Sequence, residues 1–450
     1  MTGRWTFRRW LLLVAAIWAA GGVAACAAPP ADLLRQVLPG AAATFEAEGD
    51  RQLAGGRTAE AVLAYRQAVT HDERRVSALR KLARVYAGQG RKRLAQRYLQ
   101  KAVTLRPNDA GLATELSALS SPDRAAGPLE PAWLALANAG RPTGMAVADG
   151  ALAVALEEGR VLLLDAVTGE LRWEIGLPAR LTSAPALAPG MALVGGADGA
   201  LHALDVADGR LLWRYQTSAP IYAAPLVVDK VIYAPSGDGS FAALSAADGT
   251  PRWRIDAIAL LTGRPAFADG MIYFGAADGR IFGVDAAAGH ELWGSGIVAQ
   301  GAVESEPAVA DGRVFIGAGD SRLYVLAAAT GGEYWRYSTP DAIYARPLVI
   351  SDTVYVASAG NILAALDALT GELRWELNTD SALHHAPALV GNTLYYTAAA
   401  DPNLYAVAAA TGEALWRFDT GDWLASGPLV ADGMLYLVGL DGAVMAWRLP

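Results

Sequence analysis

Apolar and polar residues alternate in short runs from residue 130 to residue 450. In one representative stretch, Asp269-Gly270, Asp278-Gly279 and a turn ending at Gly289 separate the runs PAFA, MIYFGA, RIFGVD and ELWGSG. Runs of β-branched and aromatic residues that are bounded by Asp and Gly predict strands joined by tight hairpins. We therefore expect a repeating unit of four strands in this region.

Tryptophan marks the period of this repeat. Eight tryptophans recur at spacings of 40, 40, 40, 40, 42, 40 and 41 residues: Trp133, Trp173, Trp213, Trp253, Trp293, Trp335, Trp375 and Trp416. A glycine precedes seven of them by four residues: Gly169, Gly209, Gly249, Gly289, Gly331, Gly371 and Gly412. A four-stranded period of about 40 residues is typical of a propeller blade. The pattern predicts an eight-bladed β-propeller over residues 130–450.

The two ends of this region complement each other. The last segment supplies three strands and stops before a Gly-x-x-x-Trp strand, whereas the segment around Trp133 supplies such a strand alone. We expect these strands to share one blade, because closing the ring removes exposed strand edges.

Residues 41–120 have a helical pattern. Residues 42–75 and 76–109 align at a period of 34, which is the tetratricopeptide (TPR) spacing, although Glu48 and Glu73 depart from it. Small residues at 61, 68, 95 and 102 would let paired helices approach closely. The pattern predicts a TPR-like domain over 41–120, with flanking helices at 31–38 and 111–119, and a linker over 121–129. A generic pair of helical hairpins is the alternative. The chain is thus expected to be a multidomain α plus all-β protein.

The N-terminus has the features of an export signal. Three arginines precede an apolar run from Trp10 to Ala20, and small residues follow as far as Cys26. This run is too short for a confident membrane span. We expect a signal peptide over 1–25 and a tether over 26–40. Val-Ala-Ala-Cys resembles a bacterial lipobox, which implies a lipid on Cys26; a plain signal with an incidental cysteine is the alternative.

Charge is divided between the two halves of the chain. Residues 27–110 contain 15 Lys/Arg and 8 Asp/Glu, whereas residues 111–450 contain 19 and 37. The net charge of −8 argues against broad nucleic-acid binding. The basic helical part would suit acidic partners, anionic lipid headgroups or its own propeller, or it is a solvated face with no special partner.

The motif Asp-Ala-x-Thr-Gly-x-x-x-Trp stands nearly whole at Asp165–Trp173 and Asp367–Trp375. It resembles the repeat of quinoprotein dehydrogenases and of the BamB family of outer-membrane assembly lipoproteins. The resemblance covers residues 130–450 and implies that the eight tryptophans dock between neighbouring blades. Sugar stacking is the alternative role for such a row of tryptophans.

Candidate binding residues lie in the connections between an outer strand and the next inner strand, which we expect at the mouth of the central channel. A proline follows each of them: Pro185, Pro225, Pro265, Pro307, Pro347, Pro387 and Pro428. Large polar residues before these prolines are the candidate rim residues: Tyr222, Arg264, Glu304, Glu306, Tyr344, Arg346, His384 and His385. They form either a solvated ring that pairs with itself, as in Arg264–Glu306–Arg346, or a site for a peptide or small molecule.

Other chemistry is sparse in the sequence. Five aspartates are expected to cap turns rather than to bind calcium: Asp198, Asp238, Asp278, Asp320 and Asp441. The sequence contains no nucleophile motif, no metal-spaced histidine set and no phosphate loop. We therefore expect no catalytic residues, no metal and no cofactor.

Together these features predict a non-catalytic, lipid-anchored scaffold of the cell envelope, similar to the BamB family. In a host with two membranes it would face the periplasm from the outer membrane. Its partners would be the membrane, through the anchor, and other envelope proteins, through the propeller rim and the TPR groove. BamB proteins typically lack a TPR segment, so the same partner is not implied.

Two other functions remain open. One is a lipoprotein that binds glycans or small ligands. The other is an enzyme that uses pyrroloquinoline quinone, although this propeller is shorter than in those dehydrogenases. Their adjacent-cysteine disulfide is also impossible with one cysteine.

The anchor gives a direct test. Mass spectrometry of the mature protein should find Cys26 at the N-terminus carrying a diacylglycerol, and Cys26→Ser should move the protein from the membrane to the soluble fraction. An unmodified mature N-terminus would contradict the lipobox interpretation.

Overall fold

The computed structural model describes residues 41–72, 74–88, 92–119, 131–136, 140–256, 259–293 and 298–449. The predicted signal peptide, the tether with Cys26, the helix expected at 31–38 and the predicted linker lie outside these residues. No helix among the described residues is both long enough and apolar enough to cross a membrane.

Five helices are described in the N-terminal part: α3 (Ala41–Ala54), α4 (Thr58–His71), α5 (Val76–Gly88), α6 (Lys92–Leu105) and α7 (Ala110–Leu119). Their shared core contains Tyr65, Leu82, Leu99 and Leu112, all nearly fully buried. Ala61, Ala68, Ala95 and Ala102 are completely buried, which agrees with close packing of small residues between helices. The helices fall near the predicted boundaries, and their assignment to the TPR family stays a prediction.

The strands form eight sheets, which we number as blades in chain order. Blade 1 contains β2 (Pro142–Ala148), β3 (Ala151–Leu156), β4 (Arg160–Asp165) and β5 (Leu171–Gly176). Blade 2 contains β6 (Ala186–Ala188), β7 (Met191–Gly195), β8 (Ala200–Asp205) and β9 (Leu211–Gln216). Blade 3 contains β10 (Leu226–Val228), β11 (Val231–Pro235), β12 (Ser240–Ser245) and β13 (Pro251–Asp256). Blade 4 contains β14 (Ala266–Ala268), β15 (Met271–Gly275) and β16 (Ile281–Asp285).

The second half of the ring repeats this arrangement. Blade 5 contains β17 (Ala308–Ala310), β18 (Arg313–Gly317), β19 (Arg322–Ala327) and β20 (Glu333–Ser338). Blade 6 contains β21 (Leu348–Ile350), β22 (Thr353–Ser358), β23 (Ile362–Asp367) and β24 (Leu373–Asn378). Blade 7 contains β25 (Ala388–Val390), β26 (Thr393–Thr397), β27 (Asn403–Ala408) and β28 (Ala414–Asp419). Blade 8 contains β29 (Leu429–Ala431), β30 (Met434–Val438), β31 (Ala443–Arg448) and β1 (Pro131–Leu136).

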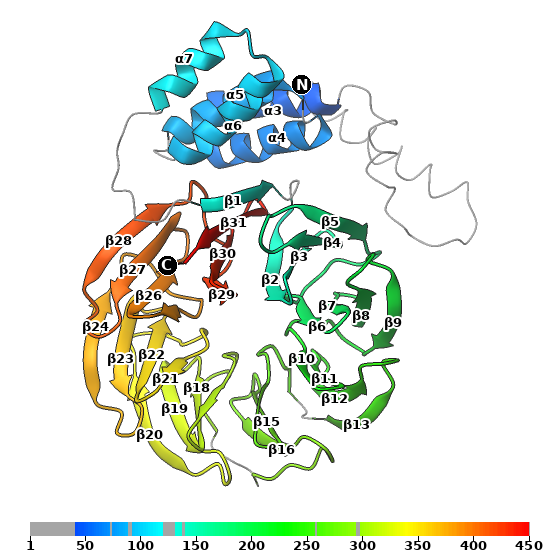
Figure 1. The fold of residues 1–450 in the computed structure, drawn as a ribbon, viewed down its shortest axis with the longest axis vertical. Coiled ribbons are helices and arrows are strands. Elements are labelled where there is room, and N and C mark those ends of the chain that lie inside the picture. Colours follow the sequence, from blue (N-terminus) through cyan, green and yellow to red (C-terminus); the bar gives the residue numbers. More distant parts are fainter. Residues whose placement is uncertain are drawn as a thin grey trace, which may run out of the picture. The chain divides into compact units, whose positions relative to one another are not determined.

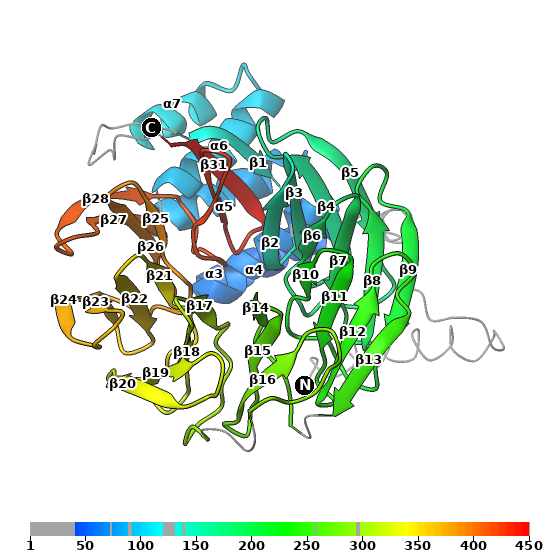
Figure 2. The same cartoon turned by 60° about the horizontal axis from the view of Figure 1, so that its bottom comes forward.

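The blades surround a common axis, with the first strand of each blade innermost (Figure 1 and Figure 2). Successive strands within each blade are antiparallel. This arrangement confirms the predicted eight-bladed propeller.

Blade 8 combines strands from both ends of the propeller region. Strand β1 pairs antiparallel with β31, and Trp133 lies opposite Ala446. The outermost strand of this blade therefore comes from the segment that precedes blade 1 in the chain.

Blade 4 differs from the four-stranded unit that the sequence predicts. Only three strands are described there, and the expected fourth run, ELWGSG, forms an isolated bridge between Glu291 and Val284. Residues 294–297 lie outside the described part of the chain.

The hydrophobic core lies between the blades. Each of the eight core clusters of the described propeller residues combines side chains from two neighbouring blades, as Leu163 of blade 1 and Val194 of blade 2 do. The second strands are almost wholly buried because a blade packs on each of their faces. The outer strands alternate between more buried and exposed residues, as in β24.

The repeated spacing of glycine and tryptophan has a geometric cause at these interfaces. Gly371 adopts a φ of +78°, and a Cβ added there would lie 2.8 Å from the Trp335 ring of the preceding blade. The same contact recurs for each of the seven Gly–Trp pairs, from Gly169 with Trp133 to Gly412 with Trp375. Glycine is therefore required both for its backbone conformation and for the space that the indole fills.

The same interfaces contain directional hydrogen bonds. The carbonyl oxygen of Ala286 accepts a hydrogen bond from Trp253 Nε1 at 3.0 Å and from Tyr233 Oη at 3.1 Å. Equivalent pairs of donors from the preceding blade meet at Ala166, Ala328 and Ala409. The indoles of Trp133, Trp253, Trp293 and Trp375 are thereby fixed in orientation as well as packed between blades.

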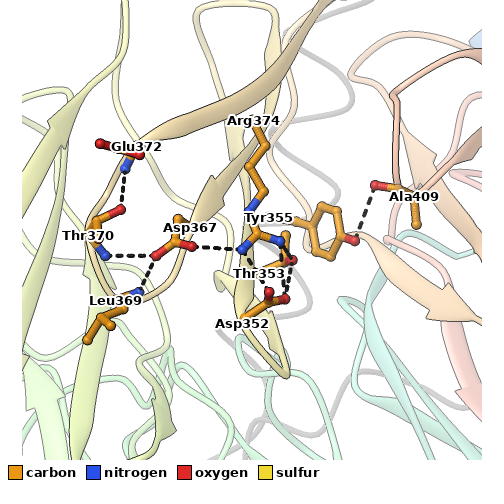
Figure 3. A network of polar contacts seen from close by, with 9 residues as sticks. All are labelled: Asp352, Thr353, Tyr355, Asp367, Leu369, Thr370, Glu372, Arg374 and Ala409. Carbon is orange, nitrogen blue, oxygen red and sulfur yellow. Dashed lines mark hydrogen bonds and ion pairs between the residues drawn. The ribbon is translucent and has the colours of Figure 1, made fainter.

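The aspartate of the repeat motif holds the same turn (Figure 3). Asp367 accepts hydrogen bonds from the backbone N–H groups of Leu369 and Thr370 and from Arg374, which also pairs with Asp352 at 2.9 Å. The hydrogen bonds from Arg374 and Thr370 lower the pKa of Asp367 to about 2. The charged groups of this outer turn thus form short ion pairs with one another.

Replacing a turn glycine tests the glycine–tryptophan contact. Gly270→Ala, at a φ of +78° with open space around it, should cost about 1–2 kcal/mol of unfolding free energy for backbone strain alone. Gly371→Ala has the same φ and should cost about 1–3 kcal/mol more, because its methyl group meets Trp335. Equal losses in denaturant titrations of the two variants would contradict this account.

The role of β1 in the ring gives a second test. Trp133→Ala should lower the unfolding free energy by about 3 kcal/mol, because the side chain packs between blades 8 and 1. Leu134→Ala, on the same strand but 45% exposed, is the control and should change it by less than about 0.5 kcal/mol. Deleting residues 131–136 should lower the melting temperature further, and an unchanged melt would mean that the ring does not depend on this strand.

Candidate functional site

The connections between blades share one local design. Seven connections have a proline, and the apolar residue four positions before it is buried in each: Leu181, Ile221, Leu261, Val303, Ile343, Leu383 and Leu424. Its backbone N–H bonds to the preceding blade, as Ile343 does to Ala318 O at 3.1 Å. Three residues follow this apolar anchor, and the middle one is small and buried in the first five connections, from Ser183 to Ala345. The first and third residues are thereby left to vary.

The third residues of successive connections meet one another. A Cβ added at Gly144 would lie 2.5 Å from Ala184 Cβ, and one added at Gly427 would lie 2.7 Å from Ala386 O. We call this set the axial ring: Gly144, Ala184, Ala224, Arg264, Glu306, Arg346, Ala386 and Gly427. Five members have no side chain beyond Cβ, and the three charged members occupy consecutive connections.

The three charged residues form one cluster. Glu306 Oε1 lies 3.9 Å from Arg264 Nη1 and 3.5 Å from Arg346 Nε. Both distances exceed the range of about 2.7–3.2 Å that is typical of an N–H···O hydrogen bond. The Nε atom of Arg264 is buried and has no hydrogen-bond partner among the described residues. The structure therefore brings together the predicted Arg264–Glu306–Arg346 trio. Glu306 lies too far from either guanidinium group to accept a hydrogen bond from it.

The first residues of the connections surround this cluster. Tyr344 and His384 come from adjacent connections, and their rings meet edge to face with centroids 5.9 Å apart. Tyr222 and Tyr344 are 43% and 42% exposed. Glu304 accepts a long hydrogen bond from Thr262 Oγ1, at 3.4 Å. These four candidates thus present aromatic and acidic groups beside the axial ring.

His385 differs from the other candidates. It occupies the middle position of its connection, where the first five connections place serine, alanine or glycine, and it is half-buried. Burial and the neighbouring His384 lower the pKa of His385 to about 4, so it is neutral at pH 7.

Sequence reasoning missed two features of this site. The apolar anchor is a clear signal, because it recurs four residues before every proline, and it explains why only the first and third residues vary. Leu260 was also missed; it is 39% exposed and lies with Tyr222 beside the turn at Gly237. A single exposed leucine carries no sequence signal that separates it from ordinary surface.

The turn aspartates have the contacts of structural caps. Asp198, Asp278 and Asp441 each accept a hydrogen bond from the backbone N–H two residues later. No group of three or more His, Cys, Asp or Glu in the described part of the chain could hold a metal ion.

Charged residues on the helices pair with one another across α3, α5 and α7. Lys81 Nζ lies 2.8 Å from Glu46 and 2.7 Å from Asp50, and Glu115 Oε1 lies 2.6 Å from both Arg80 and Arg84. Hydrogen bonds from the two arginines lower the pKa of Glu115 to about 2. In contrast to the propeller cluster, these groups are matched by close partners on neighbouring helices.

Comparisons with solved structures agree with the fold. BamB from Moraxella catarrhalis has a TM-score of 0.63 and 20% identity over 71% of this chain and 100% of that chain. The computationally designed protein Ika8 has a TM-score of 0.62 and 20% identity over 69% and 96%. Quinohemoprotein alcohol dehydrogenase from Comamonas testosteroni has a TM-score of 0.59 and 16% identity over 72% and 77%. At these identities the likeness shows the fold alone.

A family comparison is more specific. No curated protein sequence matches the chain. The family model described as outer membrane protein assembly factor BamB matches residues 125–224, 221–295, 278–395 and 378–448. These matches span most of the chain and the whole propeller, and the chain therefore belongs to the BamB family.

Proposed function

We propose that this chain is a non-catalytic, lipid-anchored protein of the cell envelope that holds other envelope proteins. Membership of a family described as an outer-membrane assembly factor supports this role. Cys26 and the signal peptide would supply the membrane attachment, and the helical domain, interpreted as TPR repeats, would supply a second binding surface. In a host with two membranes, the protein would face the periplasm from the outer membrane.

The uneven rim of the propeller is the observation that carries this proposal. A ring without a binding site would be expected to have similar residues in every connection, because the blades repeat. Instead, the large polar residues at the first and third positions lie on consecutive connections: Tyr222, Arg264, Glu304, Glu306, Tyr344, Arg346 and His384. The connections before blades 2 and 8 have only Thr182, Ala184, Ala425 and Gly427 at these positions. Tyrosine and arginine are the residues that most often dominate protein–protein binding energy. The rim therefore supports binding on one side of the ring.

A quinone-dependent dehydrogenase is the second candidate, and the fold match to a quinohemoprotein alcohol dehydrogenase is the observation that favours it. The residues of this chain do not fit such a centre. The described residues offer no cluster of metal ligands, and the single cysteine excludes the disulfide that the resemblance implies. A glycan or small-ligand site at the rim is the remaining alternative.

Site-specific photo-crosslinking tests the proposal. A photoreactive phenylalanine analogue at Tyr344, on the rim, should capture discrete envelope proteins in living cells. The same analogue at Tyr334, which is 56% exposed on the outer strand β20, is the matched control and should capture few. Equal capture at both positions, or none at Tyr344 and Tyr222, would contradict a binding rim.

A further inference from the structure

The charged members of the axial ring are paired more loosely than the arginines of the repeat motif. Arg374 lies 2.8 Å from Asp367 and 2.9 Å from Asp352, and Arg172 lies 2.7 Å from Asp165. Arg264 and Arg346 instead share the one carboxylate of Glu306, at 3.9 and 3.5 Å. Two guanidinium groups thus face a single acid that is within hydrogen-bonding distance of neither.

These side chains are positioned to exchange partners. Arg264 and Arg346 are 40% and 51% exposed, and Glu306 is 23% exposed. Neither contact is within hydrogen-bonding distance, so displacing Glu306 breaks no hydrogen bond between it and the two arginines. The neighbouring members of the ring, Ala224 and Ala386, add no bulk beyond Cβ. A carboxylate from outside could therefore approach both guanidinium groups.

We propose that Glu306 holds the place of a carboxylate supplied by an acidic segment of a partner protein, which Arg264 and Arg346 bind when Glu306 turns away. This inference rests on the proposed binding function and names the chemistry of its partner. Each guanidinium presents a planar set of donors that matches a carboxylate in a bidentate geometry. Without a partner, the negative charge of Glu306 offsets the repulsion between the two guanidinium groups.

The surroundings favour a protein segment over a small anion. Tyr222, Leu260, Tyr344 and His384 are exposed on connections on both sides of the arginines. A lone carboxylate needs only the two guanidinium groups, whereas exposed aromatic rings around them offer contact area to a longer chain. Because the propeller half of the chain is acidic, with 37 Asp/Glu against 19 Lys/Arg over residues 111–450, an acidic segment would be repelled elsewhere on this domain.

Fluorescence polarisation with the full-length protein tests this inference. The probe is a labelled peptide of alternating Glu and Ser, and a Gln/Ser peptide and free succinate are the comparisons. Arg264→Ala/Arg346→Ala should weaken binding of the Glu peptide at least about tenfold. Glu306→Gln should strengthen it about two- to fivefold, because the internal competitor is gone. Both effects should shrink as salt is raised.

Matched variants separate the site from general charge. Arg254→Ala/Arg336→Ala removes two positive charges from the outer strands, and Glu372→Gln removes one negative charge from an exposed turn. Neither should change binding of the peptide by more than about twofold. Melting curves of all variants verify folding, and tighter binding by Glu306→Gln cannot arise from a misfolded protein.

The outcomes decide the inference. It is overturned if neither the wild type nor Glu306→Gln binds the Glu peptide, if Glu306→Gln binds it more weakly, or if succinate binds as tightly as the peptide. Photo-crosslinking at Tyr344 in the double arginine variant distinguishes the two proposals. Partners that are still captured there would leave the scaffold function standing while carboxylate recognition fails.

Discussion

Packing of one indole on one glycine, repeated from blade to blade, is the contact on which this propeller depends. Seven of the outer tryptophans cover the turn glycine of the next blade, and six of these seven donate a hydrogen bond to a carbonyl beside it; Trp335 is the exception. The contact requires a residue without Cβ at a positive φ, so it fixes two positions in every repeat. The contact joins neighbouring blades at the outside of the ring, far from their innermost strands.

Because these contacts lie at the outside of the ring, the residues of the inner connections can differ from blade to blade. At the outside of the ring, tryptophan and glycine hold neighbouring blades together, and short ion pairs such as Arg374–Asp367 hold the turn within one blade. Seven of the connections share a buried apolar residue and, four positions later, a proline. The first and third positions vary in size and charge from one connection to the next, so polar chemistry gathers there in some connections, whereas others keep alanine or glycine. The loosely paired Arg264, Glu306 and Arg346 are the clearest case of this freedom.

The sequence predicted the propeller well because the fold is periodic. Tryptophan spacing and Asp-Gly turns repeat often enough that eight blades could be counted, and among the described residues blade 4 has three of its expected strands. The sequence also identified which connection positions are polar, but not their distances. The gap of 3.5–3.9 Å between Glu306 and the arginines depends on blade geometry, which no local pattern encodes. His385 was grouped with exposed residues because spacing alone does not separate the middle position from its neighbours.

Hydrogen exchange on the full-length protein, with and without an envelope partner identified by cross-linking, tests the binding rim most directly. The account predicts added protection confined to the connections at residues 221–225, 261–265, 303–307, 343–347 and 383–387, with the outer strands unchanged. Protection concentrated on the outer strands, or spread evenly over all eight blades, would contradict it.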